Sequence, residues 1–130
     1  MSEEKLLLVQ GQQGMELPRE GENWVLLKDL GYSPVQSLVA AVGSCGAYVY
    51  QSILEKSRIP YRFDRVEINY VRDEERESEP VKEITLVFFV EVEESKQGRA
   101  ERGLGMVSKY CPVMQSIDPT IVVTEKVVFI

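Results

Sequence analysis

The segment from Ser33 to Pro60 constrains the fold more than any other part of the sequence. Ser33 and Pro34 are typical of a helix start, with Ser as the N-cap and Pro at the first helical position. Pro60 stops a helix that runs to about Lys56. Between residues 38 and 50 this helix is apolar or small on almost every face. Because such a helix belongs in a core, the rest of the chain is expected to cover it.

The predicted helix carries two glycines that need a structural reason. Inside a helix, Gly43 and Gly46 each cost about 1 kcal/mol relative to alanine. They belong to a run of small side chains, which consists of Ala40, Ala41, Gly43, Ser44, Gly46 and Ala47. This run would let a sheet or a partner helix approach closely.

Short strands are predicted before the helix and longer ones after it. Apolar patterning and turn signals predict strands over Lys5–Gln10, Met15–Leu17, Trp24–Lys28, Arg62–Arg72, Val81–Val92 and Ile121–Ile130. Two more helices are predicted over Ser95–Lys109 and Pro112–Ser116, and the acidic segment 73–80 is predicted to be a hairpin loop. This order of elements is typical of an α+β fold. The chain has 130 residues, so we expect one domain over residues 1–130.

The absence of histidine excludes several kinds of chemistry. No Ser-His-Asp or Cys-His pair can form, and the usual histidine-bearing zinc and iron sites are excluded. Two cysteines are too few for a four-cysteine metal site within one chain. We therefore expect no metal and no cofactor, and any catalysis would have to use thiols, carboxylates, Lys, Arg or Tyr.

Charge and hydropathy point to the cytoplasm. The net charge of −6 argues against a nucleic-acid partner, which would favour a basic surface. The apolar run Leu6–Val9 is too short for a signal peptide, and no uninterrupted apolar stretch reaches the length that spans a membrane. In the cytoplasm the two cysteines are expected to be reduced thiols.

The two cysteines occupy different predicted environments. Cys45 lies in the middle of the apolar helix, whereas Cys111 precedes Pro112 at the start of a short helix. Free cysteines most often pack as small apolar side chains, so both thiols can be inert. The free amides and dipole at a helix start lower a thiol pKa, so Cys111 can instead be reactive. The residues alone leave both readings open.

Two segments of the sequence resemble the motifs of one protein family. The run SPVQSLVAAVGSC, residues 33–45, resembles the central-helix motif of the OsmC/Ohr family, the osmotically inducible and organic hydroperoxide resistance proteins. The run KYCPV, residues 109–113, followed by QSI at residues 115–117, resembles the second-cysteine motif of that family. The order of strands and helices matches over nearly the whole chain.

The resemblance implies a fold and an activity. The fold would be OsmC-like, with mainly antiparallel sheets wrapped around a buried central helix in an intertwined homodimer. In the peroxidase members, the helix cysteine attacks an organic hydroperoxide and becomes a sulfenic acid, which the second cysteine converts to a disulfide. A dithiol such as a lipoyl group then reduces the disulfide. Carried over, Cys45 would be the peroxidatic thiol and Cys111 the resolving thiol.

The chain departs from the family motif at two positions near the predicted substrate site. The peroxidases carry an Arg where this sequence has Gln12, and a Glu where it has Val35. Gln12 can donate a hydrogen bond but brings no charge, and Arg19 is the cation that could replace the missing one. The resemblance implies that Gln12, Val35 and Tyr110 lie on the substrate side of the thiols.

Three functional hypotheses follow. The first is a thiol-dependent peroxidase that reduces organic hydroperoxides through Cys45 and Cys111. The second is a divergent OsmC-fold protein with another thiol-redox task, in which Cys111 can be the more reactive thiol, or with a small apolar ligand. The third is a non-catalytic dimer with inert thiols.

Overall fold

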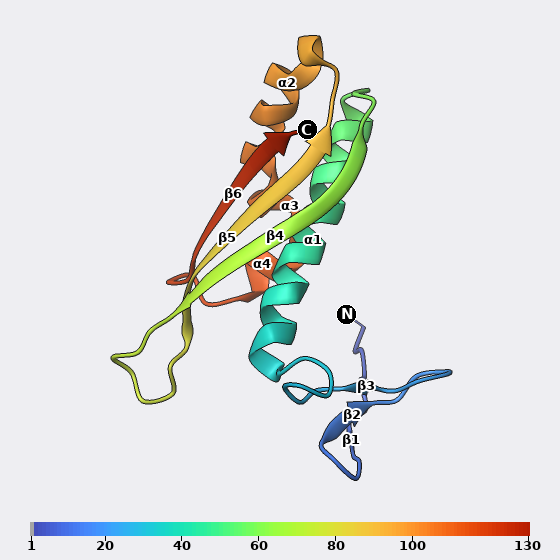
Figure 1. The fold of residues 1–130 in the computed structure, drawn as a ribbon, viewed down its shortest axis with the longest axis vertical. Helices are drawn as coiled ribbons and strands as arrows, with labels where there is room; N and C mark the ends of the chain where they lie inside the picture. Colours follow the sequence, from blue (N-terminus) through green and yellow to red (C-terminus); the bar gives the residue numbers. More distant parts are fainter. Residues whose placement is uncertain (1) are drawn as a thin grey trace. The chain divides into compact units, whose positions relative to one another are not determined.

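The computed structural model describes residues 2–130, which form two compact units (Figure 1). The N-terminal unit ends at Leu38, and the C-terminal unit comprises Val39–Ile130. The long helix α1, Pro34–Lys56, begins in the first unit and continues through the second. Both cysteines lie in the C-terminal unit.

The N-terminal unit holds a small antiparallel sheet of three strands in the order β1-β2-β3. The strands are β1 (Val9–Gln10), β2 (Met15–Leu17) and β3 (Trp24–Val25). The first strand is shorter than the predicted Lys5–Gln10, because only Val9 and Gln10 find partners on the three-residue β2. The third strand likewise ends before the predicted Lys28. Both outer strands are therefore shorter than predicted, because the central strand β2 has only three residues to pair with them.

Helix α1 begins with the cap that its sequence predicts. The Ser33 hydroxyl accepts a hydrogen bond from the Gln36 amide at 3.0 Å, and the Gln36 side chain accepts one from the Ser33 amide at 2.9 Å. This reciprocal capping box satisfies two amides that the first turn would otherwise leave free. The helix bounds confirm the prediction from residue 34 to residue 56.

The C-terminal unit contains a sheet of three long strands in the order β4-β5-β6. β4 (Arg62–Arg72) pairs antiparallel with β5 (Val81–Glu91), and β6 (Val122–Phe129) runs parallel to β5. From Ile84 to Val90, every other residue of β5 is buried, and Leu86, Phe88 and Val90 are fully so. The sheets are mainly antiparallel, as the resemblance implies, with the β5–β6 pair as the exception. A parallel pair requires a long crossover, which the remaining helices supply.

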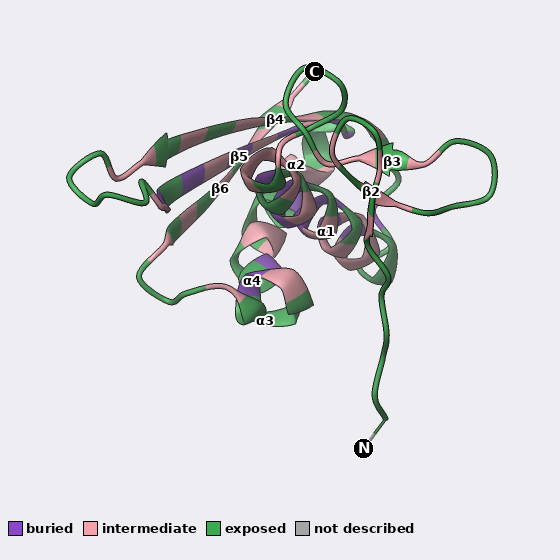
Figure 2. Cartoon of the chain, turned by 90° about the horizontal axis from the view of Figure 1, so that it is seen from below, coloured by how far each residue is buried: buried purple, intermediate pink, exposed green. Residues whose placement is uncertain are grey.

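The core of this unit lies between α1 and the inner face of the sheet. Figure 2 shows α1 along one face of the sheet, with buried residues on α1 and on β5. Tyr50 is fully buried, its ring stacks on Phe88 at 5.2 Å between centroids, and its hydroxyl donates to the Ala100 carbonyl at 2.7 Å. The small residues of α1 permit this approach: a Cβ on Gly43 would lie 2.3 Å from Ile68 Cδ1 of β4. Gly43 and Gly46 thus lie in the close contact with the sheet that was expected to explain glycines inside a helix.

The opposite side of α1 is exposed in the single chain. Ala40, Ser44 and Tyr48 are exposed, and Tyr48 keeps 74% of its surface accessible. Within the C-terminal unit, the sheet and its crossover therefore cover α1 on one side only. By length and composition alone α1 also meets the requirement for a membrane-crossing helix, a test that a buried core helix passes as well.

The crossover between β5 and β6 differs from its prediction. The single helix expected over Ser95–Lys109 is divided into four short segments: a 3₁₀ turn η1 (Glu94–Lys96), α2 (Gln97–Arg102), a 3₁₀ turn η2 (Gly103–Met106) and α3 (Val107–Tyr110). Gly103 packs against α1, where a Cβ would lie 3.1 Å from Ile53 Cγ2. The break lets Ala100 and Val107 both become fully buried. The predicted short helix is present as α4 (Pro112–Ser116).

Candidate functional site

The first thiol, Cys45, is held in the middle of α1 and is half-buried. Its backbone is rigid because the helix continues for more than two turns on either side. Gly46 follows it on the buried side of the helix. Cys45 is a free thiol, and the residue is only partly buried, unlike Cys111.

The second thiol, Cys111, is held at the junction of α3 and α4. Its backbone is extended, with φ −89° and ψ 108°, as expected for a residue before proline. The sulfur caps α4 by accepting a hydrogen bond from the Met114 amide at 3.5 Å. The side chain is a free thiol with no exposed surface.

Burial raises the pKa of Cys111, which corrects the expectation from the helix start. The amides of Met114 and Val113 do act as predicted and favour the thiolate. Loss of water around the buried sulfur opposes them and is the larger effect, and the neighbouring Cys45 raises the pKa further. Cys111 is therefore a neutral thiol at neutral pH.

The structure brings the two thiols together. Cys45 lies close enough to Cys111 to raise the pKa of that thiol, so the two side chains are neighbours. One member of the pair is accessible and the other is shielded from solvent. Such a pair can be oxidised at the accessible sulfur and then closed to a disulfide by the shielded one. No cluster of His, Cys, Asp or Glu side chains suited to a metal ion occurs within residues 2–130.

The residues predicted for the substrate side are distributed over both compact units. Tyr110 directly precedes Cys111 and is 55% exposed, with Lys109 Nζ 5.4 Å from the centre of its ring. Gln12 is exposed in the turn between β1 and β2, and Val35 is half-buried in the first turn of α1. Gln12 and Val35 belong to the N-terminal unit, whereas Tyr110 and the thiols belong to the C-terminal unit.

Arg19 has its own partners within the N-terminal unit. Its guanidinium lies 6.0 Å from the centre of the Trp24 ring, and its amide donates to the Asn23 side chain at 3.1 Å. These contacts hold Arg19 at the turn between β2 and β3.

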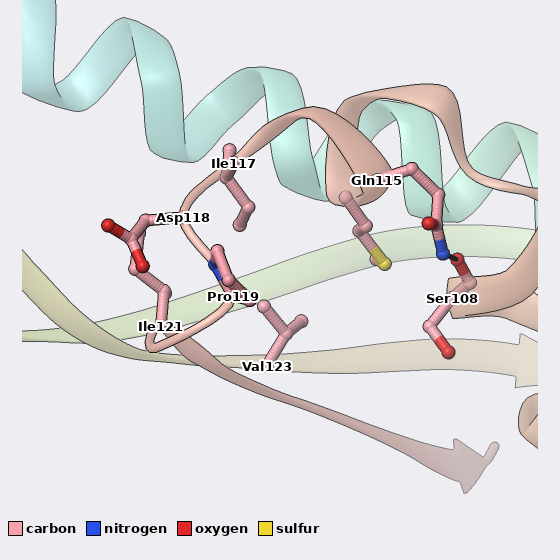
Figure 3. Close-up of a pocket in the computed structure, with 8 residues that line it drawn as sticks. Ser108, Gln115, Ile117, Asp118, Pro119, Ile121 and Val123 are labelled. Atoms are coloured by element: carbon pink, nitrogen blue, oxygen red, sulfur yellow. Dashed lines mark hydrogen bonds between the residues drawn. The ribbon is translucent and has the colours of Figure 1, made fainter.

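An open groove runs beside α4 (Figure 3). It has a volume of about 420 Å³ and is lined by Ser108, Met114, Gln115, Ile117, Asp118, Pro119, Ile121 and Val123. Figure 3 shows Ile117 and Val123 directed toward the same space from the α4–β6 connection and from β6. Met114 links the groove to the thiols, because its side chain lines the groove and its amide binds Cys111. The sequence did not single out Met114, which lies between the two runs of the second-cysteine motif.

A buried carboxyl group in β6 was also not predicted. Glu125 pairs in register with Leu86 on the inner face of the sheet. Its Oε1 atom is buried and has no hydrogen-bond partner in the described part of the chain. Burial raises the pKa of Glu125. The sequence does contain a clue to this carboxyl group. Side chains of β6 alternate between inward and outward positions, and Glu125 occupies an inward position where an apolar residue would be expected.

Comparison with known proteins identifies relatives over most of the chain. The profile of the OsmC-like protein family matches residues 27–126. No curated protein matches the chain.

Several solved structures share the fold. A hypothetical protein from Aquifex aeolicus superposes with a TM-score of 0.82 and 19% identity, over 100% of this chain and 98% of that one. An OsmC-like protein from Mycoplasma pneumoniae gives a TM-score of 0.69 and 13% identity, covering 99% and 96% of the two chains. The organic hydroperoxide resistance protein OhrB of Bacillus subtilis gives 0.62 and 13%, covering 95% and 96%.

Proposed function

This chain belongs to the OsmC-like protein family, and from that premise we propose that it reduces organic hydroperoxides through Cys45 and Cys111. The observation that carries the proposal is the pairing of two free thiols, one reachable and one buried. The similarity in fold to an organic hydroperoxide resistance protein supports the same chemistry.

In the first step, Cys45 acts as the nucleophile. Its thiolate attacks the terminal oxygen of the hydroperoxide, the O–O bond breaks, and the organic part leaves as an alcohol after taking up a proton. Cys45 becomes a sulfenic acid, and the hydroperoxide has gained two electrons. The accessibility of Cys45 favours it over Cys111 for this step.

In the second step, Cys111 resolves the sulfenic acid. Its thiol loses a proton, its sulfur attacks the Cys45 sulfur, and the hydroxyl group leaves as water. Burial keeps Cys111 a neutral thiol, which protects it from peroxide until the sulfenic acid forms beside it. An external dithiol then returns both cysteines to thiols by exchange and becomes a disulfide itself.

The substrate-side residues follow from the family motif. We assign Gln12 a hydrogen-bond donor role in place of the family's Arg, and Val35 and Tyr110 apolar contact with the organic part of the substrate. Without a cation at the Gln12 position, the Cys45 thiolate loses a source of stabilisation, so turnover is expected to be slower than in the Arg-bearing peroxidases. We place the protein in the cytoplasm, because the thiols require reducing conditions. We propose a homodimer, because the exposed side of α1 carries small residues and the large ring of Tyr48, which a second copy would cover.

Peroxide consumption with a dithiol reductant tests the proposal. Cumene hydroperoxide and hydrogen peroxide are compared, with dihydrolipoamide as the reductant, for the native protein and for Cys45→Ser and Cys111→Ser. We expect turnover to favour cumene hydroperoxide and to be lost in Cys45→Ser. Mass spectrometry of Cys111→Ser should find Cys45 as a sulfenic acid or its oxidation products. Absence of turnover by the native protein with both peroxides would overturn the proposal.

A further inference from the structure

Gly46, the residue after Cys45, packs so closely against its neighbours that a larger side chain would displace them. A Cβ at this position would lie 3.0 Å from Leu86 Cδ1 and 3.0 Å from Met114 Cε. Leu86 is fully buried in the central strand β5, so it has no room to move away. The other contact is with Met114 of α4, which also borders the open groove.

Met114 connects this contact to the second thiol. Its side chain packs over Gly46, and its amide donates to the Cys111 sulfur at 3.5 Å. An added side chain at residue 46 would therefore press on the same residue whose amide holds the Cys111 sulfur at the start of α4. The absence of a side chain at residue 46 allows α4 to lie close to α1 at the level of Cys45.

Gly43 provides an internal comparison one helical turn earlier. It is also buried in α1, and a Cβ there would meet Ile68 Cδ1 at 2.3 Å and Leu86 Cδ2 at 3.7 Å. These contacts belong to the sheet alone, and none of them involves α4. The two glycines thus perform similar packing against the sheet but differ in their contact with Met114.

We propose that Gly46 is a positioning residue for disulfide formation: it lets Met114 hold Cys111 within reach of Cys45. The inference deepens the proposed function, because it concerns the second step of the same thiol cycle. The reaction of Cys45 with peroxide does not depend on this role of Gly46. Disulfides form only within narrow limits of geometry, so a small shift of α4 has a large effect on this step.

A redox titration without peroxide tests the inference separately from the proposed function. The protein is equilibrated with oxidised and reduced glutathione, quenched by acid, alkylated and weighed by mass spectrometry. In the reaction, two protein thiols and one glutathione disulfide give one protein disulfide and two glutathione thiols. The equilibrium constant of this reaction measures how closely the fold holds Cys111 and Cys45 in the geometry of a disulfide.

The native protein is compared with Gly46→Ala and with the matched control Gly43→Ala. We expect Gly46→Ala to lower the equilibrium constant for the disulfide by roughly tenfold. Gly43→Ala is expected to change it by no more than about twofold, even if its thermal midpoint falls further. Equal losses in the two variants would overturn the inference, because they would reflect general helix packing.

A second pair of variants keeps the test decisive if Gly46→Ala does not fold. Gly46→Ala is placed in a Met114→Ala background, where the Met114 Cε contact no longer exists, and is compared with Met114→Ala alone. We expect the two to have the same disulfide equilibrium constant, because the path from residue 46 to Cys111 has been removed. A further loss in the double variant would show that Met114 does not carry the effect, and would overturn the inference.

The proposed function and this inference fail in different ways. A native protein that forms the Cys45–Cys111 disulfide with glutathione but does not consume hydroperoxide contradicts the proposed function alone. A native protein that consumes hydroperoxide, with a disulfide unaffected by Gly46→Ala, contradicts this inference alone.

Discussion

Cys45 and Cys111 carry the same side chain in two unlike regions of the C-terminal unit. Cys45 lies within the long helix α1 and remains half-exposed. Cys111 lies between two short helices, where it is fully buried and caps α4. The comparison shows that a helix start and burial act on a thiol in opposite directions, and that burial prevails at Cys111.

The largest expected difference between the two regions is in thiol reactivity. We expect Cys45, studied in Cys111→Ser, to react with iodoacetamide on the order of a hundred times faster than Cys111, studied in Cys45→Ser. The reason is that a reagent reaches Cys111 only through local opening of the fold, which costs several kcal/mol. Rates are followed by mass spectrometry at pH 8.

The same measurement in denaturant is the control, since the two unfolded thiols should react at similar rates. If Cys111 were alkylated as fast as Cys45 in the folded protein, the distinction between an accessible and a shielded thiol would be wrong.

The second difference concerns stability. Cys111→Ala removes a buried sulfur and the acceptor for the Met114 amide, so we expect it to lower the free energy of unfolding by about 2 kcal/mol. The matched variant Cys45→Ala removes a half-buried side chain from a good helix position, so we expect a loss of less than about 1 kcal/mol. Urea denaturation of both variants checks the order. If Cys45→Ala lowered the free energy of unfolding more than Cys111→Ala does, the contrast between the two cysteines would be wrong.

The smallest expected effect concerns Glu125. This side chain lies in a strand, so it shows the effect of burial on a pKa without a helix cap. Burial raises the pKa of this carboxyl, and its Oε1 has no partner in residues 2–130. A raised folded pKa means that the fold favours the protonated form. The stability gained from that protonation is complete below the unfolded pKa of about 4.3 and is lost as the pH rises through the folded pKa.

We therefore expect Glu125→Leu to raise the free energy of unfolding at pH 7 by about 1 kcal/mol, a low figure because the side chain is only half-buried. The gain should shrink toward pH 4. Thermal denaturation across this range measures it, with Glu83→Leu on the exposed face of β5 as the control. A gain that does not change with pH would mean that the carboxyl is not the cause.

Local sequence was sufficient to predict most of the elements. The Ser33 N-cap, the alternation in β4 and β5, and the proline at the start of α4 each act over a few residues. The cysteine motifs were recognised for the same reason, because each is a short run of residues. The membership of the OsmC-like family then agrees with the fold expected from them.

Contacts between distant segments decided what local sequence could not. Predicted as one helix, the crossover is broken at Gly103, where it packs against Ile53 of α1. β6 lies parallel to β5 because the crossover returns it to the same end of the sheet.

The sequence by itself determined that any catalysis would have to proceed without histidine, that one apolar helix would organise the core, and that Cys111 would stand at a helix start. Only the tertiary structure decided how deeply Cys111 is buried, that Cys45 is its neighbour, and that Met114 packs over Gly46. The physical reason is that a hydrogen-bonded cap is local, whereas loss of water around a sulfur depends on every segment that surrounds it.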